Sequence, residues 1–176
     1  MHFDNYCIRL LEQGDVTAYF RLIEANRPRL EDFFAGLVSK TKTAADTSLF
    51  IAGAVDKINE KTYFPFLIID STDGRTAGFI DVKNIDWSIP KAELGCFMDK
   101  EHEGKGIATK AMNIIVAHLF GDLGFNKLFL RTHESNNAAR ALAAQCGFEQ
   151  EGILRRDYKT TQGQLVDLVY YGLLKK

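Results

Sequence analysis

One junction, in which a short strand passes through a glycine loop into a long helix, constrains the fold most. Residues Glu93–Thr109 read ELGCFMDKEHEGKGIAT, with glycines at positions 104 and 106. From Gly104 to Leu119 the apolar residues recur at helical spacing, which predicts an amphipathic helix. The first amides of a helix have no partner within it and carry partial positive charge. The junction therefore predicts a site for a phosphate or pyrophosphate group.

This glycine loop does not match two common nucleotide-binding motifs. It lacks the GxxxxGK[ST] pattern of nucleoside-triphosphate loops and the GxGxxG pattern of dinucleotide-binding folds. The four histidines form no HxxH or HExxH pair, so no metal site is predicted.

The remaining chain alternates between strand-like and helix-like segments, which predicts a mixed α/β (α+β) domain. Seven strands are expected at Tyr6–Leu11, Tyr63–Ile69, Ala77–Ile85, Glu93–Met98, Lys127–Thr132, Phe148–Leu154 and Leu165–Leu173. Helices are expected at Val16–Asn26, Arg29–Val38, Ala44–Asn59, Gly104–Leu119 and Asn136–Cys146. Pro28 is expected to end the first helix. The order is β-ααα-βββ-α-β-α-ββ in a single domain over residues 1–176.

Composition excludes several classes of protein. The chain is 46% hydrophobic and 26% charged with a net charge of −1, which argues against disorder, nucleic-acid binding and membrane-surface binding. Its three cysteines are widely separated and the first residues lack a signal-peptide pattern, so we expect unpaired thiols and a cytoplasmic location.

Two separated motifs carry a resemblance to a known family. They are ELGxFxDxxxxGKGIATxA, starting at Glu93, and KLxLRTHESNxAARxLxxxCGFxxEG, starting at Lys127. Together they resemble the GNAT family of N-acetyltransferases, and within it the ribosomal-protein N-terminal acetyltransferases. The resemblance implies a mixed, mostly antiparallel seven-stranded sheet flanked by helices, and acetyl-CoA as the cofactor.

The resemblance also implies the residues that hold acetyl-CoA. The backbone of the strand at Phe97 and Met98 would pair with the pantetheine arm. Asn136 would contact that arm near the thioester, flanked by Ala139 and Arg140. The pyrophosphate would lie on the loop formed by Glu103, Gly104, Lys105, Gly106, Ile107, Ala108 and Thr109.

Three positions depart from the family pattern. Glu101 stands where a Gln or Arg is usual, Ala139 where relatives of the ribosomal-protein type often carry Ser, and Ala143 where many members carry Tyr. That Tyr protonates the leaving thiolate, so here a water, a backbone amide or a tyrosine from elsewhere is expected to do so.

Several residues are candidates for the chemistry itself. Glu93 is the first candidate for the base, acting through a water, with an edge-strand carboxylate as its structural alternative. Glu134 and His133 are weaker candidates, because a helix-capping role for Glu134 and a structural role for His133 at a strand end are favoured over catalysis. An acyl intermediate on Cys96 is disfavoured, since no base in the sequence is placed to activate it.

The acceptor is expected to be a primary amine that receives the acetyl group by direct transfer. An α-amine has a pKa of about 7.7–8.0 and a lysine amine one of about 10.4, so the α-amine needs less help from a base. We therefore expect a protein N-terminus, and the resemblance implies first that of a ribosomal protein. The resemblance also implies that the last hairpin, with Tyr158 and Asp167, shapes the acceptor pocket, and Trp87 is expected to border it. The alternatives are a small amine, such as a polyamine or amino sugar, and a non-catalytic acyl-CoA-binding domain. The family also suggests a homodimer.

Overall fold

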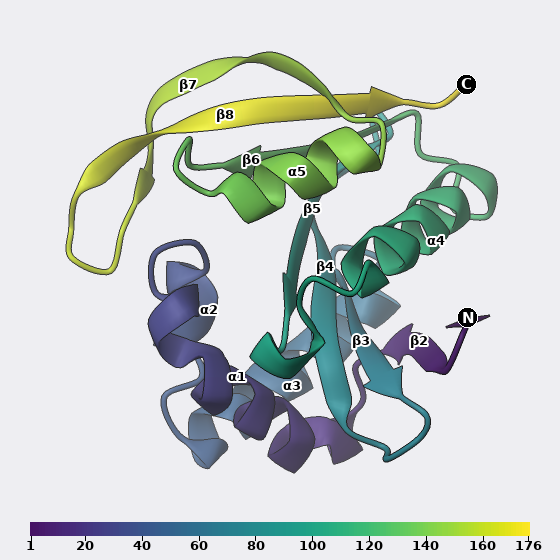
Figure 1. Ribbon diagram of the computed structural model, residues 1–176, viewed down its shortest axis with the longest axis vertical. Helices are drawn as coiled ribbons and strands as arrows, with labels where there is room; N and C mark the ends of the chain where they lie inside the picture. Colours follow the sequence, from purple (N-terminus) through teal and green to yellow (C-terminus); the bar gives the residue numbers. More distant parts are fainter.

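Eight strands form one continuous sheet in the computed structural model, which describes residues 1–176 (Figure 1). The strands are β1 (His2–Phe3), β2 (Tyr6–Leu10), β3 (Phe64–Asp70), β4 (Thr76–Asp86), β5 (Lys91–Met98), β6 (Lys127–Thr132), β7 (Glu149–Lys159) and β8 (Leu165–Leu174). Their order across the sheet is β1-β2-β3-β4-β5-β6-β8-β7. The mixed, mostly antiparallel sheet is confirmed, because only β5 and β6 are parallel. The eighth strand, β1, has two residues, too few for an alternating pattern to predict.

Five helices flank the sheet: α1 (Val16–Leu30), α2 (Ala35–Ser39), α3 (Ala44–Asn59), α4 (Ile107–Gly121) and α5 (Asn137–Gln145). Short 3-10 turns at Gln13–Asp15 and Lys100–His102 precede α1 and α4. The predicted bounds of α3 are correct, with Thr43 accepting the Asp46 amide at the start of the helix.

The expected boundary at Pro28 is wrong. Helix α1 continues through Pro28 to Leu30, and the expected helix over 29–38 is reduced to the short α2. The proline removes one backbone hydrogen bond of the helix. The buried face at Leu22, Ile23 and Leu30 packs in the core, however, and holds the last turn in place. The chain then turns at Phe33 and Phe34, whose amides both bond to the Leu30 carbonyl.

Each face of the sheet buries a separate apolar core. On one face, α1 and α3 cover a cluster that includes Tyr19, Phe79 and Phe97. On the other face, α4 and α5 cover a larger cluster that includes Leu94 and Met98. Because successive side chains of a strand point to opposite faces, β5 contributes to both cores.

Strands β5 and β6 separate soon after they begin to pair. Their register comprises three pairs, the last of which joins Glu93 and Phe129. Beyond it the strands diverge, with α4 providing the connection between them. The divergence leaves the backbone of β5 beyond Leu94 without a neighbour on the β6 side, and it opens the sheet near its centre.

Strands β7 and β8 form a long hairpin that crosses over α5 and extends toward α2 (Figure 1). The pairing of β7 with β8 is interrupted between Leu154 and Tyr158 and then resumes. Strand β7 therefore extends to Lys159, beyond its predicted end at Leu154. At its far end the hydroxyl of Tyr158 accepts a hydrogen bond from the Ala35 amide at 2.8 Å. The hairpin is thereby tied to the N-terminal helices.

No helix of the structure has the length and apolar character needed to cross a membrane. All three cysteines are unpaired.

Candidate active site

The glycine loop before α4 presents a run of unpaired amides. Lys110 is the first residue of the helix whose amide bonds to a backbone carbonyl, that of Gly106. The six amides from Gly104 to Thr109 donate to no other group of the chain. Both Gly104 and Gly106 have positive φ, at +70° and +74°, and a Cβ at either position would point into open space. This geometry fits the predicted phosphate site.

A cavity of about 850 Å³ extends from this loop along β5. Its walls are the β5 residues Cys96, Phe97 and Met98, the α5 residues facing them, and the turn after α1. Of the expected cofactor residues it is lined by Phe97, Met98, Glu103, Gly104, Gly106, Ile107, Ala108, Thr109, Asn136 and Ala139. The cavity is long and is polar at the loop end, as a cofactor with a phosphate head and an extended arm requires.

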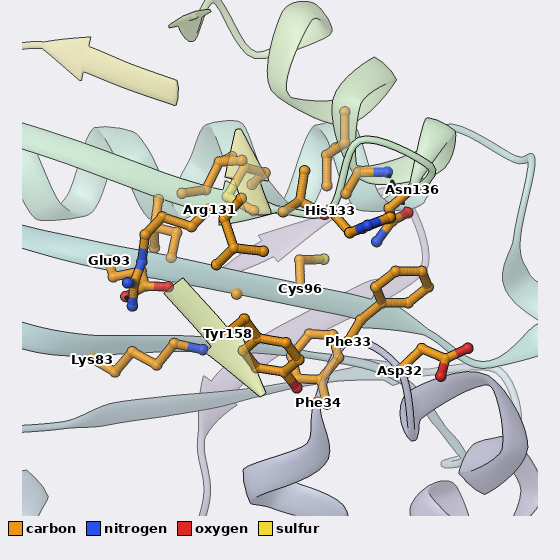
Figure 2. A pocket seen from close by; sticks show the side chains of 18 residues that line it. Asp32, Phe33, Phe34, Lys83, Glu93, Cys96, Arg131, His133, Asn136 and Tyr158 are labelled. Atoms are coloured by element: carbon orange, nitrogen blue, oxygen red, sulfur yellow. Dashed lines mark hydrogen bonds and ion pairs between the residues drawn. The ribbon is translucent and has the colours of Figure 1, made fainter. Parts of the chain in front are cut away.

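A second, smaller cavity of about 170 Å³ lies beside the point where β5 and β6 separate (Figure 2). In Figure 2, Glu93 and Arg131 lie at one end of it, Asn136 and His133 at the other, and Cys96 between them. The two cavities adjoin and share Asp32, Phe33, Phe34, Cys96, Asn136, Ala139 and Leu142. A reaction between two bound molecules would take place where these residues meet.

Glu93 is a central-strand residue, and the reading of it as an edge-strand carboxylate is wrong. Its side chain is 7% exposed and lines the smaller cavity. Its Oε2 atom accepts hydrogen bonds from Asn84 at 2.6 Å and from the Arg131 guanidinium at 2.8 Å. Arg131 also pairs with Asp157, so the buried carboxylate is compensated by a shared cation.

Asn84 reaches Glu93 because of an irregularity in β4. The register of β4 against β5 shifts between Lys83 and Asp86, and Asn84 has a φ of +49°. A bulge of this kind redirects a side chain, and asparagine tolerates the left-handed conformation better than most residues. Asn84 is not among the residues predicted for the site, although an asparagine inside a predicted strand was an available signal.

Charged side chains of both signs line the smaller cavity. Asp32 and Glu93 contribute carboxylates, while Lys83 and Arg131 contribute cations. Lys83 lies 3.4 Å from a carboxylate oxygen of the buried Asp81, and a Cβ at Gly95 would lie 2.3 Å from that same oxygen. Glycine at position 95 is therefore needed for Asp81 and Lys83 to lie against β5.

Asn136 caps the N-terminal end of α5 at the junction of the two cavities. Its Oδ1 atom accepts the Ala139 amide at 3.1 Å, which leaves its side-chain NH2 group without a partner in the chain. His133 lines the smaller cavity beside it, and its Nδ1 lies 2.6 Å from the Ser135 hydroxyl. Glu134 is exposed and lines neither cavity.

The Cys96 thiol lies between the two cavities but is unsuited to act as a nucleophile. Burial, with smaller effects of Cys146 and Asp81, raises the pKa of Cys96 to about 12. A thiol with this pKa is almost fully protonated at neutral pH, and no base hydrogen-bonds to it. These properties agree with the packed thiol favoured by the sequence.

Several predicted residues lie outside both cavities. Trp87 stacks on Phe125, with ring centroids 4.7 Å apart, and its indole donates to the Lys61 carbonyl. Asp167 is exposed and accepts the Arg156 amide at 2.8 Å. The structure thus places neither residue at the smaller cavity, whereas Tyr158 does line it.

Two predicted cofactor residues also line neither cavity. The side chain of Arg140 bonds to the Tyr171 hydroxyl and the Glu134 carbonyl, and that of Lys105 is exposed on the loop. Glu101, the departure from the family pattern, pairs with Arg75 on the surface.

The two alanines that stand where family members carry Ser or Tyr have different surroundings. Ala139 lines both cavities, whereas Ala143 is fully buried in the core. Neither can supply a proton. Tyr158 is the one phenol among the residues of the smaller cavity.

Comparison with known proteins gives a consistent result. The family model described as "Acetyltransferase (GNAT) domain" matches residues 5–149. The chain is 33% identical to the "Putative ribosomal N-acetyltransferase YdaF" of Bacillus subtilis (strain 168), over 98% of this chain and 93% of that protein. It is 30% identical to the spermidine N(1)-acetyltransferase of Escherichia coli (strain K12), over 49% of this chain and 46% of that one. In fold it resembles RimL, a ribosomal alpha-N-protein acetyltransferase solved in complex with coenzyme A. For that structure the TM-score is 0.89, the identity is 18%, and the match covers 98% of this chain and 95% of that one.

Proposed function

The chain belongs to the GNAT family of acetyltransferases, and we propose that it moves the acetyl group of acetyl-CoA onto the N-terminal α-amine of a protein. The observation that carries the proposal is the meeting of the two cavities beside Asn136, where β5 and β6 separate. One cavity suits an extended cofactor with phosphates, and the other suits a small amine-bearing group.

The larger cavity would hold the cofactor, which supplies an acetyl group activated as a thioester. The six unpaired amides from Gly104 to Thr109 would bind its phosphates. The unpaired β5 backbone at Phe97 and Met98 would hydrogen-bond its arm, as an added strand does at a sheet edge. The free NH2 group of Asn136 would position the arm near the reacting carbon.

Glu93 would accept the proton of the amine through a water. It lines the acceptor cavity, and both of its hydrogen bonds engage Oε2, so Oε1 has no partner in the chain. Because an α-amine has a pKa of about 7.7–8.0, a base of modest strength is sufficient near neutral pH.

Tyr158 would return a proton to the thiolate, in the role that Ala139 and Ala143 cannot fill. Its oxygen accepts the Ala35 amide, which leaves its own proton free to donate. Burial raises the pKa of the Tyr158 phenol above its ordinary value despite the opposing hydrogen bond from Ala35, so the phenol is protonated at neutral pH.

The size of the smaller cavity and the comparisons favour a protein N-terminus over a polyamine. The small volume of about 170 Å³ suits one terminal residue. The ribosomal-protein acceptor is supported by the relative that matches nearly the whole chain, whereas the spermidine enzyme matches about half of it.

The test is a comparison of acceptors. Release of CoA from acetyl-CoA is followed with peptides that begin with Ser, Ala or Met, and separately with spermidine and amino sugars. Mass spectrometry locates the acetyl group. Acetylation at peptide N-termini supports the proposal, with N-terminally blocked peptides as the control. Acetylation of the small amines alone refutes the protein acceptor, and CoA binding without turnover on either set favours a non-catalytic domain.

A further inference from the structure

Helix α1 brings a positive charge to the glycine loop, although the two segments are far apart in sequence. Arg29, in the last turn of α1, lines the larger cavity together with Glu103, Gly104 and Gly106. None of the predicted roles included Arg29, because it was expected to begin a separate helix. Its place in this cavity adds a full positive charge to the partial positive charges of the six unpaired amides.

A buried asparagine holds Arg29 in this place. Asn26 is fully buried one turn earlier on α1, and its Oδ1 accepts Nη1 of Arg29 at 2.8 Å. The same oxygen accepts the Lys100 amide at 3.2 Å, and Nδ2 donates to Asp99 Oδ1 at 2.8 Å. Asn26 thus joins α1 to the end of β5 and to the segment that leads into the loop.

The second nitrogen of the guanidinium, Nη2, pairs with the carboxylate of Glu103. Glu103 is the residue directly before Gly104, so this carboxylate lies at the edge of the amide run. The side chains are 39% and 45% exposed, and an exposed pair of this kind contributes little to stability. The guanidinium can therefore exchange Glu103 for another anion at little cost.

We propose that Arg29 is a phosphate ligand of the cofactor site, and that the phosphate displaces Glu103 from its guanidinium. An arginine can form two parallel hydrogen bonds with a phosphate as it does with a carboxylate. Asn26 is the positioning residue, and Glu103 is an internal competitor that sets the affinity. The inference rests on the proposed use of acetyl-CoA.

The first experiment measures CoA binding by isothermal titration calorimetry for three proteins. Arg29→Met is expected to raise the Kd for CoA by about tenfold to a hundredfold, the range typical of a lost hydrogen bond to a charged group. Arg21→Met is the matched control, because Arg21 is exposed on the same helix and bonds to no side chain. It should bind CoA as the parent does, and thermal unfolding of each variant checks that it is folded.

Two outcomes would overturn the inference. An unchanged Kd in Arg29→Met would show that Arg29 does not bind the phosphate. An equal loss in both variants would show a general effect of charge. Failure of the proposed use of acetyl-CoA looks different, because the parent itself would then bind no CoA.

A second experiment tests the exchange. Glu103→Gln is expected to lower the Kd for CoA, because it frees Arg29. The same change in the Arg29→Met background should give a smaller gain, since residues that share an interaction are not additive. An equal gain in both backgrounds would show that Glu103 acts by simple repulsion and would refute the exchange.

Discussion

At the scale of single residues, the site depends on side chains that three different strands bring together. Glu93 on β5 meets Asn84 from β4 and Arg131 from β6. The sequence indicates Glu93 through its motif, but it does not indicate its partners. Asn84 reaches Glu93 because of a bulge, and Arg131 because of the parallel register, and both depend on how the strands pair.

Replacing Glu93 with glutamine tests the base. Glutamine preserves the size of the side chain but cannot accept a proton at neutral pH, so kcat should fall by about a hundredfold or more. Measured kcat against pH should also lose its dependence on an acidic group. Asp157→Asn is the matched control, because Asp157 shares Arg131 but lines neither cavity. Equal loss in the two variants would show that the charge network, and not Glu93 itself, matters.

Replacing Tyr158 with phenylalanine tests the acid. We expect kcat to fall by about tenfold to a hundredfold while the Kd for CoA stays close to the parent value. Since burial raises the pKa of Tyr158 above its ordinary value, the protonated and active form should persist far into the alkaline range in the parent, with activity lost only where the phenol ionises. Tyr170→Phe serves as the control, because Tyr170 lines neither cavity. A pH profile of Tyr158→Phe that matches the parent profile in its alkaline limb would remove Tyr158 from this role.

At the scale of elements, the strand–loop–helix junction was the most predictable part of the molecule. The motif identifies β5, the two glycines and α4 because their residue types follow directly from local backbone geometry. Pro28 shows the limit of such local reasoning. A proline disfavours a continuing helix, but the packing of Leu30 in the core outweighs that preference.

Replacing Gly104 with valine tests the loop. The φ of +70° is strained for a β-branched residue, so the loop should change conformation and its amides should no longer converge. We expect a large loss of CoA affinity by calorimetry, with the fold retained, since a Cβ at this position meets no atom within 4 Å. Gly53→Ala is the control, because it lies inside α3 with ordinary φ and should stabilise the protein by about 0.4–1 kcal/mol without affecting CoA. Unchanged affinity in Gly104→Val would contradict the phosphate site.

At the scale of the whole molecule, the two cavities lie where segments far apart in the sequence meet. The N-terminal helices supply Arg29 and Phe34, the central junction supplies the loop, and β7 supplies Tyr158. The order of elements could be read from the sequence. The order of strands in the sheet, and therefore Trp87 and Asp167 falling outside the site, follows from contacts between distant segments that local patterns do not encode.

Because the cofactor would bridge α1, β5 and α4, its binding should stabilise the entire fold. At a free CoA concentration of a hundred times its Kd, linkage gives about 2.7 kcal/mol. For a domain of this length each kcal/mol raises Tm by about 2–4 °C, so we expect a rise of about 5–10 °C in thermal unfolding. An equal concentration of pantetheine, which lacks the phosphates, should raise Tm less. An equal rise with pantetheine would contradict the contribution of the loop.

The position of β8 between β6 and β7 has a consequence for biosynthesis. Strand β7 carries Tyr158 and pairs with β8 alone, yet it precedes β8 in the sequence. A ribosome therefore makes the strand that carries Tyr158 before it makes the strand that holds it against the sheet. Until β8 inserts, β7 has no partner strand, and a nascent chain in which β5 and α4 have folded would still lack the wall of the smaller cavity that Tyr158 supplies.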